Sequence, residues 1–248
     1  MNFCDYNQVA ANDKAFAEIA LKAIKNEGYI IFKNFPIAGE LSAVKKQLEE
    51  KCTLIATPIS HDANNAIVWD IKSNPKSGSF VKTYSEHCHE ADLHTDSQYS
   101  SYPEDMFVLL SLVKADCGGG LSSFLSLKKI LEELNKLENG KEVIATFSNT
   151  DYPFIVPNVF KKTQSEEFEF NYGPILRPNE IRFRIDTFEK CLEMYPWLCS
   201  QEQILAYKAL KNIVLSTPFT KKFYLEDGDL IFINNKTVLH GRTQFMDP

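Results

Sequence analysis

Short apolar runs separated by turn-forming residues constrain the fold of this chain more than any other feature of its sequence. Many of these runs alternate apolar with polar residues, as half-buried strands do. We expect strands at Tyr29–Phe32, Met106–Val113, Ser122–Leu125, Val143–Phe147, Phe154–Val156, Glu167–Tyr172, Ile181–Ile185, Lys222–Leu225 and Leu230–Asn234. Apolar residues at helical spacing predict helices at Asp13–Asn26, Leu41–Lys51, Leu127–Leu137 and Glu202–Leu215. Many short strands with a few peripheral helices predict a mainly β fold, a double-stranded β-helix (jelly roll, cupin-like) whose mouth can hold a metal and a small ligand.

The size and charge of the chain indicate one domain and limit the classes of partner. Residues 1–248 contain no Pro-, Gly- or Ser-rich linker, and 44% hydrophobic residues suffice for a sizeable core. A net charge of −6, spread without long runs, argues against nucleic acid or an anionic membrane as the main partner.

The N-terminus lacks the pattern of a secretory signal, and the longest apolar run, Met106–Val113, is too short to span a bilayer. The six cysteines form no Cys-x-x-Cys pair and are expected to be reduced, so we expect a cytoplasmic protein.

Two histidines and one aspartate are the strongest candidates for a functional site. His94 and Asp96 are separated by one residue, so on an extended strand their side chains project to the same face. His240 ends a second strand-like run, which we expect to lie across the barrel and to supply a third ligand. Two imidazoles and one carboxylate can occupy one face of an iron(II) octahedron and leave the other face open to substrate and oxygen. Spacing alone leaves an alternative open, in which His94 and Asp96 are capping or core polar residues and His240 is an unrelated histidine near the C-terminus.

Neighbouring residues strengthen the metal-site interpretation, because several motifs occur in a fixed order. The segments concerned are Asn26–Pro36, Leu93–Asp96, Cys117–Phe124, Asp227–Asn235 and Val238–Thr243. Taken together they resemble the taurine dioxygenase and clavaminate synthase-like family of iron(II)/2-oxoglutarate-dependent oxygenases, and the resemblance spans nearly the whole chain. A set of ordered motifs is much more specific than any one of them.

The resemblance implies a cofactor set and a role for individual residues. It makes His94, Asp96 and His240 the iron(II) ligands, with 2-oxoglutarate as cosubstrate and O2 as oxidant. Ser122 stands where the family has the threonine of a Gly-Gly-x-Thr segment, whose hydroxyl contacts the 2-oxoglutarate carboxylate. Because Asp96 is present, where related halogenases have a small residue, the resemblance implies hydroxylation.

One part of the family pattern is not matched. The family carries an arginine about 10 to 15 residues beyond the distal histidine, which binds the far carboxylate of 2-oxoglutarate in bidentate fashion. This chain stops at Pro248, so we expect either that a C-terminal strand is missing or that another cation takes this role. Arg242 is the nearest candidate in sequence, and the further candidates are Arg177, Arg182 and Arg184.

Charged residues outside the iron motif suggest the class of substrate. Arg182, Arg184 and Asp186 alternate with apolar residues, which is typical of a strand with one solvated face. On one face they can also hold the carboxylate and amine of a free amino acid, and the stretch resembles the branch of the family that acts on free amino acids, including basic ones. Glu90 is a candidate to meet a cationic group of the substrate. The cluster of His87, Cys88 and His89 is better explained as part of an exposed loop at the mouth of the site than as a zinc site, because consecutive ligands on a strand point to alternate faces.

Two functions from other classes stay open on the sequence. The first is a non-catalytic or cosubstrate-independent binding protein on the same fold, which is favoured if the protein naturally lacks the unmatched arginine. The second is a zinc hydrolase that uses the same imidazoles.

Overall fold

The computed structural model describes residues 2–60, 67, 68, 70, 71, 84, 88–157 and 168–246. Within these ranges the α-helices are α1 Asp13–Glu27, α2 Leu41–Thr53, α3 Leu127–Leu134, α4 Gly140–Asn149, α5 Ile185–Met194 and α6 Gln201–Ser216, with short 3-10 helices at Tyr6–Gln8 and Pro196–Leu198. The strands are β1 Phe3–Asp5, β2 Tyr29–Lys33, β3 Ala91–His94, β4 Met106–Leu110, β5 Ser122–Ser126, β6 Tyr152–Ile155, β7 Phe170–Gly173, β8 Leu176–Arg177, β9 Glu180–Ile181, β10 Lys221–Phe223, β11 Leu230–Asn234 and β12 Val238–Arg242. No helix in these ranges has both the length and the apolar character needed to cross a membrane.

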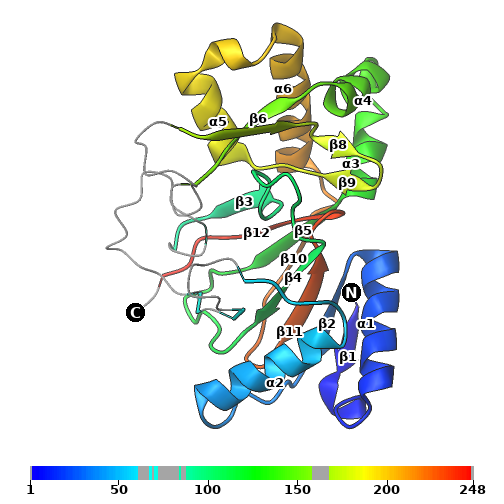
Figure 1. Ribbon diagram of the computed structural model, residues 1–248, viewed down its shortest axis with the longest axis vertical. Helices are drawn as coiled ribbons and strands as arrows, with labels where there is room; N and C mark the ends of the chain where they lie inside the picture. The colour runs from blue at the N-terminus through cyan, green and yellow to red at the C-terminus, as the bar shows by residue number, and fades with distance from the viewer. Residues whose placement is uncertain are drawn as a thin grey trace.

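Two four-stranded sheets form the centre of the molecule (Figure 1). The first has the strand order β1-β2-β11-β4 and the second has the order β10-β5-β12-β3. A cluster of buried side chains joins them, and its members come from both sheets: Tyr29, Ile31, Phe124, Phe223, Ile231, Ile233 and Val238. The two sheets therefore face each other across an apolar layer, as the sheets of a sandwich do.

The outer face of the first sheet is covered by α1 and α2, which lie together at one end of the molecule in Figure 1. Alternate residues of the central strands point this way, among them Phe32 and Phe232, and they pack on Phe16 of α1 at ring-centroid distances of 4.5 and 5.9 Å. Local signals fix the ends of α1, because the Asn12 side chain caps its start and Gly28 ends it in the left-handed conformation. Gly28 also leads directly into β2.

The outer face of the second sheet packs against the four remaining helices. Leu93, Leu125 and Leu239 point outward from β3, β5 and β12 into the largest core cluster, to which α3, α4, α5, α6 and β6 also contribute. Because neighbouring strand residues alternate between faces, His94, Phe124 and His240 point the other way, toward the first sheet. The alternation thus directs both histidines into the space between the sheets.

The expectation of a mainly β chain is only partly right, because helices hold 37% and strands 22% of the described residues. Val143–Phe147, expected as a strand, lies within α4. Its apolar residues Val143 and Phe147 are four positions apart and both buried, which suits a helix as well as a short alternating strand.

The stretch Ile181–Ile185, also expected as a strand, pairs only at its first residue, and α5 begins at Ile185. Its backbone amides donate to three separate segments. The amide of Ile181 donates to the Lys236 carbonyl, that of Arg182 to the Ile175 carbonyl, and that of Phe183 to the Thr95 hydroxyl. No continuous ladder can form from partners so dispersed.

Candidate metal centre

His94 and His240 lie directly opposite each other on paired strands. In the antiparallel pairing of β12 with β3, His240 is the partner of His94, and in the pairing of β12 with β5 it is the partner of Phe124. The two imidazole rings are 4.2 Å apart between centroids, and Phe107 of the facing sheet lies 4.2 Å from the His240 ring. The strand of His240 was expected to lie across the barrel from His94, and this was wrong: the two strands are neighbours. Cross-strand partners project to the same side of a sheet, so adjacency brings the two rings together.

An irregularity in β3 adjusts the position of His94. The pairing of β3 with β12 shifts between His240, which is opposite His94, and Arg242, which is opposite Ala91. Such a bulge bends a strand and redirects its side chains. The bulge needs a glycine on the partner strand, because a Cβ at Gly241 would stand 2.6 Å from the carbonyl oxygen of Ala91.

Asp96 completes the group just beyond the end of β3. Its carboxylate oxygens lie 3.5 Å from His94 Nε2 and 3.6 Å from His240 Nε2. One ligand atom from each of His94, Asp96 and His240 lies within 4.8 Å of the others, which a single ion can bridge. The three residues that the sequence singled out therefore meet at one point.

Asn235, in the turn between β11 and β12, fixes the main chain at Asp96. Its side-chain oxygen accepts from the Asp96 amide at 2.8 Å, and its side-chain nitrogen donates to the carbonyls of Asp96 at 3.0 Å and Glu104 at 3.1 Å. Asn235 is 1% exposed, so these bonds are shielded from water. Sequence reasoning quoted Asn235 within a motif but gave it no role, and the only local signal was a polar residue directly after a buried strand.

The protonation of the three side chains suits metal binding. His94 Nδ1 lies 2.7 Å from the Asp92 carbonyl, which can only accept, so Nδ1 carries a hydrogen and Nε2, which faces Asp96, is the nitrogen available as a metal ligand. Burial, together with His94, lowers the pKa of His240 to about 3 and keeps its ring neutral at pH 7. Burial alone would raise the pKa of Asp96, but the two imidazoles lower it below its usual range, so the carboxylate is ionised. Neutral imidazoles and an ionised carboxylate are the forms that bind a metal ion.

This donor set fits a non-haem iron(II) ion. Two imidazole nitrogens and one carboxylate oxygen on one side leave several coordination positions for other ligands. The cluster of His87, Cys88 and His89 was expected to form part of an exposed loop and not a zinc site. His87 lies outside the described residues. Cys88 and His89 belong to no ligand group in the described part of the chain.

Ser122 and Arg242 share the inner face of the second sheet with His240. They are cross-strand partners at the end of the β12–β5 pairing, two residues from the pair formed by Phe124 and His240. The Arg242 guanidinium donates to the His89 carbonyl at 3.2 Å and lies 4.4 Å over the Phe245 ring. Of the four arginines considered for the far carboxylate of 2-oxoglutarate, Arg242 is the one on the strand of His240.

Arg184 and Asp186 lie beside the candidate metal ligands as a paired unit. Two nitrogens of Arg184 donate to the two oxygens of Asp186 at 2.7 and 2.8 Å. The Arg184 guanidinium is 4.1 Å over the ring of Tyr84, and that ring is 4.5 Å from the His94 ring. Arg184 is buried, whereas the Asp186 side chain is 39% exposed and can reach a ligand.

The remaining candidates lie elsewhere. Arg182 is 1% exposed and donates to the carbonyls of Gln98 and Ser100, so its contacts are with the loop that follows Asp96. Glu90 is exposed. Burial and the nearby carboxylates of Glu90 and Asp186 raise the pKa of Asp92.

Comparisons with known proteins were consistent with one another. The family model described as "Taurine catabolism dioxygenase TauD, TfdA family" matches residues 4–248. A solved structure of asparagine oxygenase with Fe(II), 2S,3S-3-hydroxyasparagine and succinate superposes with a TM-score of 0.68 at 16% identity, over 96% of this chain and 75% of that one. The non-heme iron oxygenase OrfP with Fe and alpha-ketoglutaric acid gives 0.66 at 17% identity, over 95% and 74%. A mutant of OrfP in complex with (3S)-hydroxy-L-Arg gives 0.67 at 17% identity, also over 95% and 74%. No curated protein sequence matches the chain detectably.

Proposed function

We propose that this chain, which belongs to the TauD/TfdA family of dioxygenases, hydroxylates a free amino acid at an iron(II) ion held by His94, Asp96 and His240. Membership confirms the family and the enzyme class expected from the sequence, that of an oxygenase that uses iron(II), 2-oxoglutarate and O2. The single observation that carries the site assignment is the convergence of the three ligand atoms within 4.8 Å. Two facing sheets around this centre support the finer fold assignment, a jelly roll.

The bound cofactors would supply the oxidation. Iron with 2-oxoglutarate and O2 converts a C–H bond to C–OH, while 2-oxoglutarate loses CO2 and becomes succinate. The chain contributes position and environment. His94 and His240 present imidazole nitrogens and Asp96 presents a charge. The rings of Phe107 and Phe124 line the sheet interface beside His240, where they would limit the access of water.

In this proposal Ser122 and Arg242 hold 2-oxoglutarate. A hydroxyl and a guanidinium that face the same side of one strand pair offer hydrogen bonds and a counter-charge for a carboxylate. Arg242 would take the part of the arginine that the family carries farther along the chain. Its position on the strand of His240 supports this role.

The Arg184–Asp186 pair and Glu90 are proposed to contact the substrate. Asp186 is fixed by Arg184 and partly exposed, so it can accept from the ammonium group of an amino acid. Glu90 adds a second negative charge directly before the start of β3. A free amino acid is also what the structural neighbours suggest, since their descriptions name hydroxyasparagine and hydroxyarginine. Six free thiols support our proposal of a reducing, cytoplasmic location.

Anaerobic titration tests this function directly. When 2-oxoglutarate is added to the iron(II) protein without oxygen, chelation should give a visible charge-transfer band, and Asp96→Ala should abolish it. Adding oxygen with a panel of free amino acids should then release succinate. A protein that shows no band is a binding protein without this cosubstrate, and full zinc occupancy with hydrolysis that needs no oxygen would identify a zinc hydrolase.

A further inference from the structure

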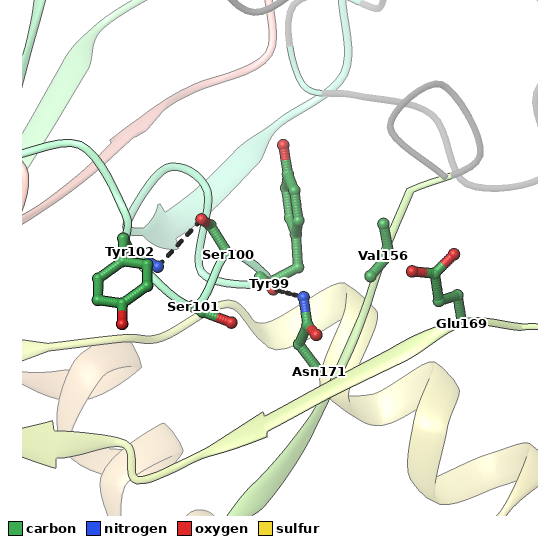
Figure 2. Close-up of a pocket in the computed structure, with 7 residues that line it drawn as sticks. All are labelled: Tyr99, Ser100, Ser101, Tyr102, Val156, Glu169 and Asn171. Carbon is green, nitrogen blue, oxygen red and sulfur yellow. Dashed lines mark hydrogen bonds between the residues drawn. The ribbon is translucent and has the colours of Figure 1, made fainter. Parts of the chain in front are cut away.

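A pocket of about 380 Å³ lies beside the loop that carries Asp96. Two walls form it (Figure 2): one is the loop Tyr99–Tyr102, and the other is the paired strands β6 and β7 with the residues that extend them. The lining side chains are Tyr99, Ser100, Ser101, Tyr102, Val156, Glu169 and Asn171. The volume is within the range of small-molecule sites, and a free amino acid fits in it.

The strand pairing directs one wall into this pocket. Val156 donates its amide to the Glu169 carbonyl, which continues the β6–β7 ladder beyond the pair of Ile155 with Phe170. Opposite residues share a face, and so do residues two apart, so Val156, Glu169 and Asn171 all project to one side. Figure 2 shows the Glu169 carboxylate on one side of the space and the Tyr99 ring on the other.

Among the described residues that line the pocket, Glu169 is the one with a formal charge. Its Oε2 is buried and has no hydrogen-bond partner within the described part of the chain. A buried carboxylate oxygen without a donor costs free energy, and a ligand N–H that reaches this oxygen after a small rotation of the Glu169 side chain recovers that cost. An oxygen in this state is suited to an N–H donor that carries a positive charge.

The other lining groups suit the same ligand. The rings of Tyr99 and Tyr102 can stack on a planar cation, and the hydroxyls of Ser100 and Ser101 can accept further hydrogen bonds. Tyr102 is 90% exposed, so it stands at the rim. The set combines one fixed negative charge with aromatic faces and neutral acceptors.

A short stretch of chain links the pocket to Asp96, one of the proposed iron ligands. Tyr99 is three residues after Asp96, which limits their Cα separation to about 10 Å, a span comparable with an extended lysine or arginine molecule.

Arg182 joins the two walls. It donates to the carbonyls of Gln98 and Ser100 in the loop, and its guanidinium lies 4.2 Å over the ring of Phe154 in β6. The side-chain nitrogen of Asn171 donates to the Tyr99 carbonyl at 2.6 Å and ties β7 to the same loop. These contacts tie both walls of the pocket to the loop that follows Asp96.

From this arrangement we propose that the pocket receives the side-chain cation of a basic amino acid, with Glu169 as the residue that selects it. The inference rests on the proposed function, and it narrows the substrate class to free amino acids that end in a guanidinium or ammonium group. Glu169 is then a specificity-determining residue that takes no part in the reaction at iron.

The test compares L-arginine with L-citrulline, which has nearly the same shape and no charge. Succinate release should show a lower KM for arginine, by roughly 30-fold, as the loss of a hydrogen-bonded charge pair predicts. Glu169→Gln should raise the KM for arginine toward that for citrulline and leave the citrulline KM nearly unchanged. Glu193→Gln, which alters an exposed carboxylate of α5 outside the pocket, should keep the wild-type preference.

Anaerobic calorimetry with both amino acids separates this inference from the proposed function. Binding of arginine in preference to citrulline, lost in Glu169→Gln, supports the pocket even if no succinate forms, and in that case only the proposed function fails. Turnover of neutral amino acids with KM values equal to that of arginine would overturn the inference and leave the proposed function standing. An arginine preference that persists in Glu169→Gln would also overturn it.

Discussion

Asn235→Ala should weaken both the fold and the metal centre. The substitution removes three hydrogen bonds, one to the amide of Asp96 and two to the carbonyls of Asp96 and Glu104, at a position that is 1% exposed. At about 1 kcal/mol for each buried bond, the free energy of unfolding should fall by about 3 kcal/mol. That is a large part of the roughly 5 to 15 kcal/mol by which domains are typically stable, measured here by urea unfolding.

Metal affinity should fall as well, because the main chain that carries the Asp96 carboxylate loses its support. Loss of groups that orient metal ligands typically costs about 10- to 100-fold in affinity, and anaerobic titration with Co(II) can measure it. Gln203→Ala is a matched control, since Gln203 also makes three hydrogen bonds but lies at the start of α6. It should lower stability without changing metal affinity. Wild-type Co(II) affinity in Asn235→Ala, or an equal loss in both variants, would refute the assigned role of Asn235.

Three further predictions follow from the geometry of the site. Gly241→Ala should destabilise the protein by about 1 to 3 kcal/mol and reduce metal binding, because the new Cβ would meet the Ala91 carbonyl oxygen at 2.6 Å; a variant with unchanged urea midpoint would contradict this. Burial lowers the pKa of His240 to about 3, so between about pH 6.5 and pH 3 the unfolded chain binds more protons than the metal-free fold. The free energy of unfolding should therefore decrease as the pH is lowered through this range, by up to about 1.4 kcal/mol per pH unit. His240→Gln should flatten that slope in urea titrations at about pH 7 and pH 5 with a chelator present. Arg184→Met should cost about 1 to 2 kcal/mol, less than a fully buried pair, because its partner Asp186 is 39% exposed; a double-mutant cycle measures this coupling.

Local sequence signals predicted the elements that local interactions determine. The helix expected at Asp13–Asn26 occurs at Asp13–Glu27, where a capping side chain precedes it and a glycine ends it. The strand expected at Leu230–Asn234 has these bounds in the structure. Val143–Phe147 was wrong because a five-residue apolar pattern fits two periods, and its packing against α6 and the core favours the helix.

The residues that gather at the candidate metal centre were predictable from their types and order, but the geometry that joins them was not. The pairing of His94 with His240 and the support of Asp96 by Asn235 are contacts between segments far apart in sequence, and no local pattern encodes them. Arg182 shows the same limit. An alternating charged stretch predicts a solvated face, yet this guanidinium is buried because the carbonyls of a distant loop accept from it.

The strand order also determines the stage of synthesis at which an iron site can form. β11 lies between β2 and β4, and β12 lies between β5 and β3, so Leu230–Arg242 supplies an inner strand to each sheet. A nascent chain that ends before Leu230 already contains His94 and Asp96, but neither sheet is continuous and the third ligand is absent. Iron loading must therefore follow the insertion of two late strands, and a ribosome-bound chain stalled before them would be an apoprotein with two unfinished sheets.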